Sequence, residues 1–341
     1  MTCFFMRYLV VGTRASPAKV NFFFASIVTL KKTKNNIIVQ WIQGCIRHPM
    51  FLYYADHRVI FAQLLPASSG QVMRFINVLS FPQINPVFFS LGPIELRWYS
   101  LMYVIGLLAV YFFFRYASRK GTLKLDNQEI ESVMLFGLVG MILGARLVYV
   151  FVYNFDYYIQ RPGEIFATWK GGLSFHGAIF GIAMAILLFA RRRNKSFFNI
   201  TDHMVTIAPV GLGFGRIGNF INGELWGRVT ESPVGMIFPD AGPFPRHPSQ
   251  LYESLFEGWI LLAIMLLVYR SKPRTGVLSA VFLVSYATFR FFIEFFREPD
   301  KQLGEVLGPF SMGQVLCALM WVIGALIMTY ALNTKPEERA V

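Results

Sequence analysis

Charged residues are scarce in this chain: only 15% of its 341 residues are Asp, Glu, Lys or Arg. Cysteine is also rare, because Cys3, Cys45 and Cys317 are the only three, and their spacing suits neither a disulfide framework nor a metal site. The sequence contains no G-x-S-x-G nucleophile elbow and no H-E-x-x-H zinc motif. These absences argue against a disulfide-stapled domain, a serine acyl-enzyme and a zinc enzyme, and we expect no metal and no cofactor.

Apolar residues are correspondingly abundant in the chain. They make up 55% of the chain, 35 of them are Phe, and the mean hydropathy is +0.49. Soluble domains of this length are less apolar, so we interpret the chain as a polytopic membrane protein. About 20 mostly apolar residues are needed for one helical span, and the alternation of a membrane β-barrel is absent. The sequence predicts an all-α integral membrane protein with seven transmembrane helices, at roughly 98–115, 131–152, 173–190, 203–222, 249–269, 276–296 and 311–332.

Positive charge in the connections predicts the orientation. Cytoplasmic loops retain Lys and Arg, and alternate connections are rich in both, whereas the opposite connections mix fewer bases with Asp and Glu. We therefore expect the N-terminus outside and the C-terminus inside. The net charge of +13 does not indicate nucleic acid, because these loops and a basic N-terminal region account for it. The expected cytoplasmic bases are Arg115, Arg119, Lys120, Lys124, Arg191, Arg192, Arg193, Lys195, Arg270, Lys272 and Arg274.

The first 72 residues differ from the rest of the chain. They carry eight Lys or Arg and one acid, Asp56, and their longest apolar run is too short to span a bilayer. Met73 then begins a segment suited to the membrane interface. We expect residues 1–72 to be a basic extension, either a mis-assigned upstream start or a poorly ordered segment, and residues 73–341 to form the seven-helix domain.

Polar side chains interrupt the predicted spans, and all of them fall on the side that should face outward. A charged side chain at the bilayer centre costs at least about 2.5 to 3.5 kcal/mol on insertion scales, so each one needs a partner or a purpose. No comparable set occupies the inner half. We predict a polar, cation-rich cavity open to the outer leaflet, formed by Tyr99, Arg146, His176, Arg216, Asn219, Asn222, Glu224, Arg290, Glu294 and Arg297.

Several of these residues also have a structural interpretation. Arg290 and Glu294 are four residues apart and can form an ion pair within one helix. Arg97 and Arg297 suit a role as interface anchors, with an apolar stem and a hydrated head. A single His at a helix end, such as His176, is more often structural than catalytic.

Two further motifs have alternatives. In "RHPSQLYE", Pro248, Ser249 and Glu253 hold the positions expected at the start of a helix, which leaves a functional role open. The stretch "GFGRIG", residues 213–218, matches a dinucleotide fingerprint by letter, but no strand precedes it and it lies in a predicted span. We interpret that match as accidental.

Buried arginines suit a phosphate ligand. The planar guanidinium binds two oxygens at once and keeps its charge when water is removed. Asn residues add neutral donors and acceptors, and His or Tyr can move a proton. These features indicate a lipid-using enzyme or a lipid carrier. An anionic-lipid transporter or scramblase is the main alternative, but it predicts polar residues that continue into the inner half. An intramembrane protease needs a Ser/Lys, paired Asp or zinc arrangement, which is absent.

Five ordered motifs carry a resemblance to a known family. The stretch "GRIGNFINGELWGR", together with "WYSLMY", "GGLSFHG", "RHPSQLYE" and "FRFFIEFFREPD", is similar to the blocks of bacterial prolipoprotein diacylglyceryl transferases, in the same order. The similarity runs from about residue 73 to about residue 334, and residues 1–72 have no counterpart. Enzymes of this family are seven-helix proteins of the bacterial cytoplasmic (inner) membrane.

The resemblance implies a reaction and its participants. Such an enzyme transfers the sn-1,2-diacylglyceryl group of phosphatidylglycerol to the lipobox cysteine of a prolipoprotein signal peptide, which forms a thioether and releases glycerol phosphate. It implies that Arg216 and Arg290 engage the phosphate and that His176 and Tyr99 are catalytic, with His176 as the candidate base for the thiol. Glu224 and a water molecule are the alternatives for taking the thiol proton. The expected lipid-binding residues are Arg146, Arg216, Asn219, Glu224, Gly227, Arg246, Arg290 and Glu294.

Overall fold

The computed structural model divides the chain into two compact units. Unit 1 comprises Met1–Pro86, Asn219–Gln250 and Phe296–Glu298, and unit 2 comprises Val87–Gly218, Leu251–Phe295 and Pro299–Val341. The predicted boundary at residue 73 falls where no side chain is described, so it stays a prediction. The residues described are 10–12, 36–38, 40–42, 50–55, 58–67, 70–92, 94–298, 305–307 and 310–334, with side chains at 79–92, 95–169, 171–298 and 310–334.

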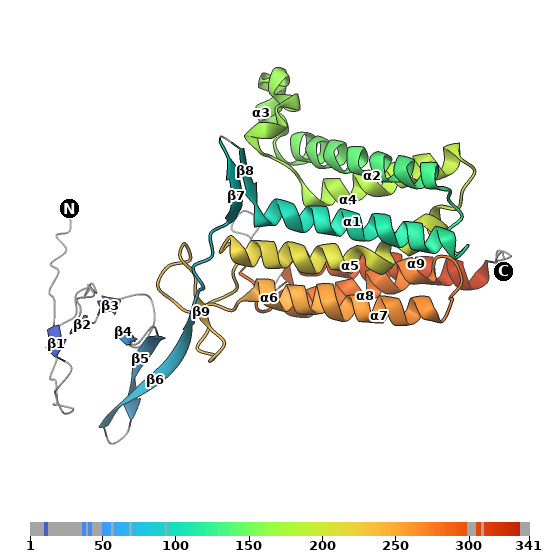
Figure 1. The fold of residues 1–341 in the computed structure, drawn as a ribbon. Helices are drawn as coiled ribbons and strands as arrows, with labels where there is room; N and C mark the ends of the chain where they lie inside the picture. The colour runs from blue at the N-terminus through green and yellow to red at the C-terminus, as the bar shows by residue number, and fades with distance from the viewer. Residues whose placement is uncertain are drawn as a thin grey trace. The chain divides into compact units, whose positions relative to one another are not determined.

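Long helices dominate unit 2 and confirm the predicted multi-pass helical protein (Figure 1). Six are long and apolar enough to cross a membrane, and α8 is a shorter apolar helix. Each coincides with one predicted span to within a few residues. That all seven cross the bilayer, and in which direction, stays a prediction. The helices are α1 (Trp98–Arg119), α2 (Asn127–Val148) continued by η1 (Tyr149–Tyr153), α4 (Phe175–Arg192), α5 (Phe197–Ile221), α6 (Ser249–Glu253) continued by η4 (Ser254–Ile260) and α7 (Leu261–Arg270), α8 (Val277–Ile293), and α9 (Met312–Asn333).

Side-chain caps fix where several helices begin. Asp126 accepts the backbone N–H of Glu129, and the Glu129 side chain accepts the N–H of Asp126 in return, which closes a capping box before α2. Ser311 and Gln314 form the same reciprocal pair before α9. Ser174 caps α4 with its hydroxyl oxygen. These caps satisfy N–H groups that have no partner inside the helix.

Glycines bring α2 and α4 into backbone contact. A Cβ added to Gly144 would overlap the carbonyl oxygen of Gly177, and one added to Gly181 would overlap that of Gly140. Small residues at this spacing let two helices approach more closely than larger side chains allow. The seam fixes α4, whose first turn carries His176, against α2, whose last turn carries Arg146.

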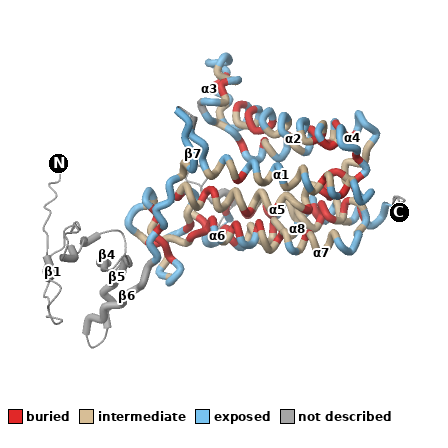
Figure 2. Tube along the Cα trace, viewed as in Figure 1, coloured by how far each residue is buried: buried red, intermediate tan, exposed pale blue. Residues whose placement is uncertain are grey.

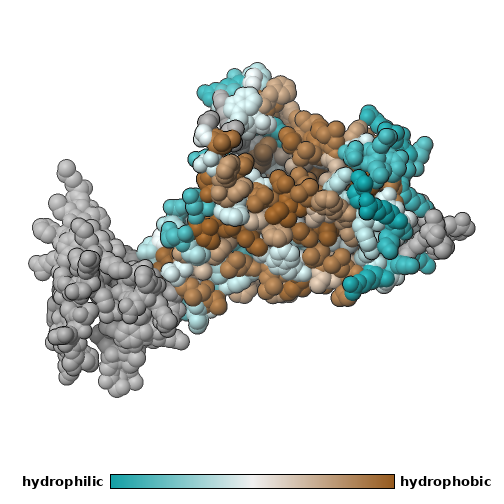
Figure 3. All heavy atoms as spheres, in the orientation of Figure 1, coloured by the Kyte–Doolittle hydropathy of each residue, from teal (hydrophilic) through white to brown (hydrophobic). Residues whose placement is uncertain are grey.

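Apolar side chains cover the helices, whereas hydrophilic ones gather at their ends. Large residues such as Phe112, Leu135 and Leu326 stay exposed on α1, α2 and α9. Exposed stretches occur along the helices (Figure 2), and the visible face of the bundle is mostly hydrophobic (Figure 3), as expected for helices that contact lipid. The basic connections after α1, α4 and α7 lie at the end of the bundle where α9 finishes. That grouping agrees with the charge pattern from which the orientation was predicted.

Short elements outside these helices were not predicted. Their runs are too short for a periodic signal to separate them from loops. Between α2 and α4 lie α3 (Phe155–Gln160) and two 3₁₀ turns, η2 (Pro162–Phe166) and η3 (Thr168–Lys170). Unit 2 also has two antiparallel pairs, β7 (Val87–Leu91) with β8 (Ile94–Arg97) and β10 (Glu305–Leu307) with β11 (Phe310–Ser311).

Unit 1 contains the remaining strands. The five-stranded sheet has the order β3-β4-β5-β6-β9, in which only the β6–β9 pair is parallel. The β6–β9 pair joins Leu79 and Ser80 to Met236 and Ile237, which lie in the loop that follows α5. The strands are β1 (Val10–Gly12) paired with β2 (Asn36–Ile38), and then β3 (Gln40–Ile42), β4 (Met50–Ala55), β5 (Arg58–Ala67), β6 (Gly70–Ser80) and β9 (Met236–Ile237).

Candidate active site

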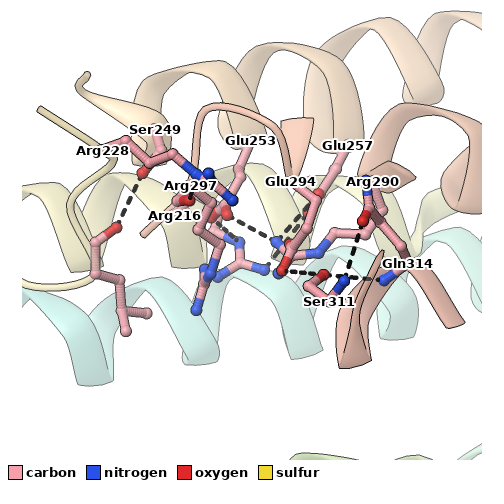
Figure 4. Close-up of polar contacts among 11 residues, drawn as sticks. Arg216, Arg228, Ser249, Glu253, Glu257, Arg290, Glu294, Arg297, Ser311 and Gln314 are labelled. Carbon is pink, nitrogen blue, oxygen red and sulfur yellow. Dashed lines mark hydrogen bonds and ion pairs between the residues drawn. The ribbon is translucent and has the colours of Figure 1, made fainter. Parts of the chain in front are cut away.

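Two arginines from different helices share the same pair of buried carboxylates in unit 2 (Figure 4). Arg216 on α5 places Nε 3.0 Å from Glu253 Oε2, and Arg290 on α8 places Nη1 2.7 Å from Glu253 Oε1. Glu257 lies farther away, 3.5 Å from Arg216 Nη2 and 3.6 Å from Arg290 Nη1. Both glutamate side chains have no exposed surface, whereas the arginine side chains keep 18% and 15%. Most of the accessible surface of the cluster therefore belongs to the two arginine side chains.

A third carboxylate holds Arg290 from its own helix. Glu294 Oε2 lies 2.8 Å from Arg290 Nη2, so the ion pair predicted from their spacing is confirmed. The Ser311 hydroxyl donates to Glu294 Oε1 at 2.9 Å, which links α8 to the start of α9. Gly313 leaves room for this carboxylate, since an added Cβ would stand 2.9 Å from Glu294 Cδ. Three carboxyl groups thus surround two guanidinium groups, in contrast to the predicted cation-rich cavity.

Close helix packing explains how the carboxylates reach α5. Gly258 faces Gly213 so tightly that an added Cβ would overlap the Gly213 Cα, and Ser254 donates its hydroxyl hydrogen to the Gly213 carbonyl at 3.0 Å. Both contacts belong to η4, a π-helical turn between α6 and α7. Such turns are rare and occur often at functional sites. The widened turn carries Glu257, and the residue just before it is Glu253.

Tyr99 and His176 have few partners in the described structure. Tyr99 opens α1, its hydroxyl lies 3.1 Å from that of Tyr103, and its ring fits against Gly218, where an added Cβ would come within 2.8 Å. His176 is exposed in the first turn of α4, with its ring edge-on to Phe175. Among the described residues no hydrogen bond or ion pair joins either residue to the arginine cluster. Their predicted catalytic roles stay predictions.

Arg146 lies in a different environment. Its side chain is buried, and its five N–H groups point to backbone carbonyl oxygens of the α2–α4 connection. The guanidinium also lies over the Tyr158 ring, 5.1 Å from its centroid. Because each donor already has an acceptor, this arginine has none left for a phosphate. The acceptors are Glu164 O, Ile165 O, Ala167 O, Gly171 O and Gly172 O, at 2.7 to 3.4 Å.

Unit 1 holds the remaining predicted residues in a hydrogen-bonded set of its own. Asn219 and Asn222 both donate to Glu224 Oε1, at 2.9 and 3.1 Å. A Cβ at Gly227 would overlap the backbone oxygen of Phe296, so no larger residue fits there without a shift. The structure thus brings Asn219 and Glu224 together, as predicted for two members of one site.

Arg246 is engaged within the same unit. It donates to the carbonyls of Gly227 and Ala241, at 3.1 and 3.2 Å, and forms an ion pair with Glu298 at 3.0 Å. Arg228 likewise donates to the Arg297 carbonyl at 2.9 Å. These bonds join the segment that follows α5 to itself and to the residues that follow α8. Within the described parts of the chain, no group of three His, Cys, Asp or Glu side chains has the placement of a metal site.

The sequence comparisons place the chain in a family. The family model described as prolipoprotein diacylglyceryl transferase matches residues 86–330, which covers both arginines and their carboxylates. The chain belongs to the prolipoprotein diacylglyceryl transferase family. The resemblance inferred from the five motifs is therefore confirmed, and with it the class of enzyme, a transferase.

The chain matches curated relatives in this family over almost the full length of each relative. The phosphatidylglycerol–prolipoprotein diacylglyceryl transferase of Photobacterium profundum is 44% identical over 259 residues, which is 76% of this chain and 97% of the relative. The protein of that name from Geobacter sulfurreducens is 49% identical over 246 residues, which is 72% of this chain and 95% of the relative. The protein of that name from Pasteurella multocida is 46% identical over 268 residues, which is 78% of this chain and 98% of the relative.

Sequence reasoning missed the two carboxylates that Arg216 and Arg290 share. Glu253 was given a possible role at a helix start, and Glu257 was not considered. A signal was present, because two acids four residues apart interrupt an otherwise apolar helix at residues 249–270. Such acids need cationic partners, and Arg216, which has no partner at helical spacing within its own predicted span, is one candidate.

Proposed function

We propose that this family member transfers the sn-1,2-diacylglyceryl group of phosphatidylglycerol to the lipobox cysteine of a prolipoprotein, in the bacterial cytoplasmic (inner) membrane. Family membership and the names of the relatives support the donor and the acceptor. The same support favours group transfer over the transporter or scramblase alternative. We also propose that all seven helices cross the bilayer, with the N-terminus outside and the C-terminus inside, on the strength of the basic loops at one end of the bundle.

The pairing of Arg216 and Arg290 is the single observation that carries the site assignment. Two guanidinium groups from different helices lie against one carboxylate, with part of each side chain accessible. A phosphate oxyanion presents the same kind of acceptor as a carboxylate, and the guanidinium fork binds both. We assign the lipid phosphate to the accessible side of these two arginines.

The reaction requires a thiolate and a stabilised leaving group. A cysteine thiol has a pKa of about 8.5 and attacks mainly as the thiolate. Its sulfur forms a bond to the glyceryl carbon next to the phosphate while that carbon–oxygen bond breaks, and the electron pair leaves with the glycerol phosphate. Arg216 and Arg290 stabilise the charge that develops on the departing oxygen. We assign the proton of the thiol to His176 as the candidate base.

The other predicted residues receive supporting roles in this proposal. Asn219 and Glu224 form a preassembled pair of donor and acceptor groups, which suits the glycerol hydroxyls of the lipid. Gly227 keeps the neighbouring backbone in close contact. Tyr99 supplies a hydroxyl at the start of α1, and Glu294 orients Arg290. We assign Arg146 to shaping a connection, because backbone carbonyls occupy all its donors. We assign Arg246 the same kind of role, because it contacts two backbone carbonyls and Glu298.

The test is a reconstituted transfer reaction. Purified protein is incubated with labelled phosphatidylglycerol and a lipobox peptide, and the peptide mass is measured. We expect the wild type to add one diacylglyceryl group and Arg216→Ala to add none while it still inserts into the membrane. Arg192→Ala, at the exposed end of α4, is the matched control and should retain activity. Full activity of Arg216→Ala would remove the phosphate role, and an unmodified wild-type peptide would refute the transfer.

A further inference from the structure

The buried cluster in unit 2 has more acid than base. Arg216 and Arg290 face the carboxyl groups of Glu253, Glu257 and Glu294, so the cluster carries one net negative charge if all five groups are ionised. Two of the three carboxylates are completely buried. Water therefore does little to screen the excess.

A phosphodiester adds a second negative charge when it binds to the two arginines. A second excess negative charge in the same buried cluster is strongly unfavourable, and a carboxyl group in that position takes up a proton instead of staying ionised. The arginines remain protonated under all ordinary conditions. The compensation must then come from a carboxyl group of the cluster.

We propose that Glu257 takes up one proton when the lipid phosphate binds, and that the phosphate replaces its contacts with Arg216 and Arg290. The inference rests on the proposed function of these arginines as the phosphate site. Glu257 is then a positioning residue: it holds both guanidinium groups in the empty enzyme and releases them in the complex. Lipid binding is an exchange of one anion for another.

Three observations select Glu257 among the carboxylates. Its ion pairs with the arginines, at 3.5 and 3.6 Å, are longer than those of Glu253, at 3.0 and 2.7 Å, so they are lost at less cost. Glu294 instead receives the Ser311 hydroxyl and a 2.8 Å ion pair. Glu257 also lies in the π-helical turn, where the helix geometry is already relaxed.

Uncharged titratable side chains also lie close to Glu257. Besides the arginines on α5 and α8 and Glu253 on its own helix, the titratable groups within electrostatic reach are Tyr286 on α8 and Cys317 on α9. A phenol and a thiol are neutral or negative, never cationic. Both arginines that pair with Glu257 are drawn to the phosphate.

Proton uptake makes lipid binding depend on pH in a defined way. Where Glu257 is ionised in the empty enzyme and protonated in the complex, linkage requires the dissociation constant to rise about tenfold for each unit of pH. The same coupling draws about one proton from solution for each lipid bound. Phosphatidylglycerol keeps its single negative charge from mildly acidic to mildly basic pH, so titration of the lipid does not produce this dependence of the dissociation constant on pH.

The experiment measures phosphatidylglycerol binding to the detergent-solubilised full chain between about pH 5.5 and 8.5, where the arginines stay charged. We expect the wild type to lose affinity as the pH rises and to take up about one proton per lipid, recorded with an indicator dye in weak buffer. Glu257→Gln should bind tightly with no dependence on pH. Glu131→Gln, which removes an exposed carboxylate on α2, should keep the wild-type slope.

Two further measurements separate this inference from the proposed function. Diacylglycerol, which has no phosphate, should bind the wild type without proton uptake, and Arg216→Ala should lose phosphatidylglycerol binding at every pH. If Arg216→Ala loses binding but wild-type binding is independent of pH, the proton uptake is wrong and the phosphate site stands. If Arg216→Ala binds normally, the phosphate site itself fails. Should Glu257→Gln not accumulate, the wild-type slope and proton count decide alone.

Discussion

This protein buries arginine in two different ways. At Arg216 and Arg290 the partners are carboxylate side chains from neighbouring helices, and part of each guanidinium side chain stays accessible. At Arg146 the partners are five backbone carbonyls of one connection, and the side chain is 5% exposed. A charged partner on a side chain can be exchanged for another anion. Backbone carbonyls cannot leave without unfolding the connection, so the second arrangement is a structural one.

The comparison divides the arginines that the sequence had grouped together. All three were expected to contribute to one cation-rich cavity, because each occurs at membrane depth in the predicted outer half. Burial alone does not distinguish a binding arginine from a structural one. The distinguishing property is the identity of the acceptors, which depends on the tertiary structure.

The largest expected effect is loss of transfer at the accessible pair. Arg290→Ala removes one of two guanidinium groups that we assign to the leaving phosphate, and we expect transfer to fall by more than about a thousandfold. Arg290→Lys retains a charge without the planar fork and should recover only part of the loss. Rates come from the mass-detected peptide assay, with size-exclusion profiles to verify folding. Equal activity of the Lys variant and the wild type would contradict a forked phosphate contact.

Substitution of Arg146 should affect activity less than substitution of Arg290 does, and it should affect stability more. Arg146→Met keeps an apolar stem but leaves five carbonyls without their donor, and one buried unsatisfied group costs about 1 to 3 kcal/mol. We expect the free energy of unfolding to fall by about 3 kcal/mol or more, measured by denaturant titration in micelles. Any variant that remains folded should keep its affinity for phosphatidylglycerol. A weaker affinity in folded protein would give Arg146 a binding role after all.

The smallest expected effect is a dependence of the free energy of unfolding on pH, and it comes from His247, a histidine outside the predicted spans. Burial lowers the pKa of His247 below its ordinary 6.5, because desolvation penalises the protonated ring, which packs against Phe296. The unfolded chain then binds the proton more readily than the folded one. The contribution to stability is complete above pH 6.5 and is lost as the pH falls through the lowered pKa.

Unfolding measurements at a series of mildly acidic pH values check this expectation. His247→Gln should remove part of the decline that the wild type shows below pH 6.5. The arginines cannot account for that part, because they stay charged throughout. Identical pH profiles for the two proteins would show that protonation of His247 is not linked to unfolding.

The helices could be predicted from sequence because a run of apolar residues is a local signal. The predicted spans match the helices of unit 2 to within a few residues, and the Arg290–Glu294 pair followed from helical spacing alone. Glu253 and Glu257 were missed as partners because helix periodicity says which residues share a face but not which faces meet. The Gly213–Gly258 approach that joins them to Arg216 depends on the packing of two helices distant in sequence.

The role of Arg146 could not be predicted for a different reason. Its acceptors are peptide carbonyls, which every residue possesses, so no side-chain pattern marks them. The two glycines that supply the last of these carbonyls have φ values of 84° and 82°, a conformation that side chains disfavour. The motif "GGLSFHG" therefore encodes a backbone path around a guanidinium as well as the position of its histidine.

The glycine seam between α2 and α4 limits how a lipid substrate can travel. At Gly140, Gly144, Gly177 and Gly181 the two backbones lie too close for even a methyl group. An acyl chain is wider than a methyl group, so it cannot slide sideways through this part of the wall. A lipid that reaches the two arginines from the bilayer must therefore pass between other helices.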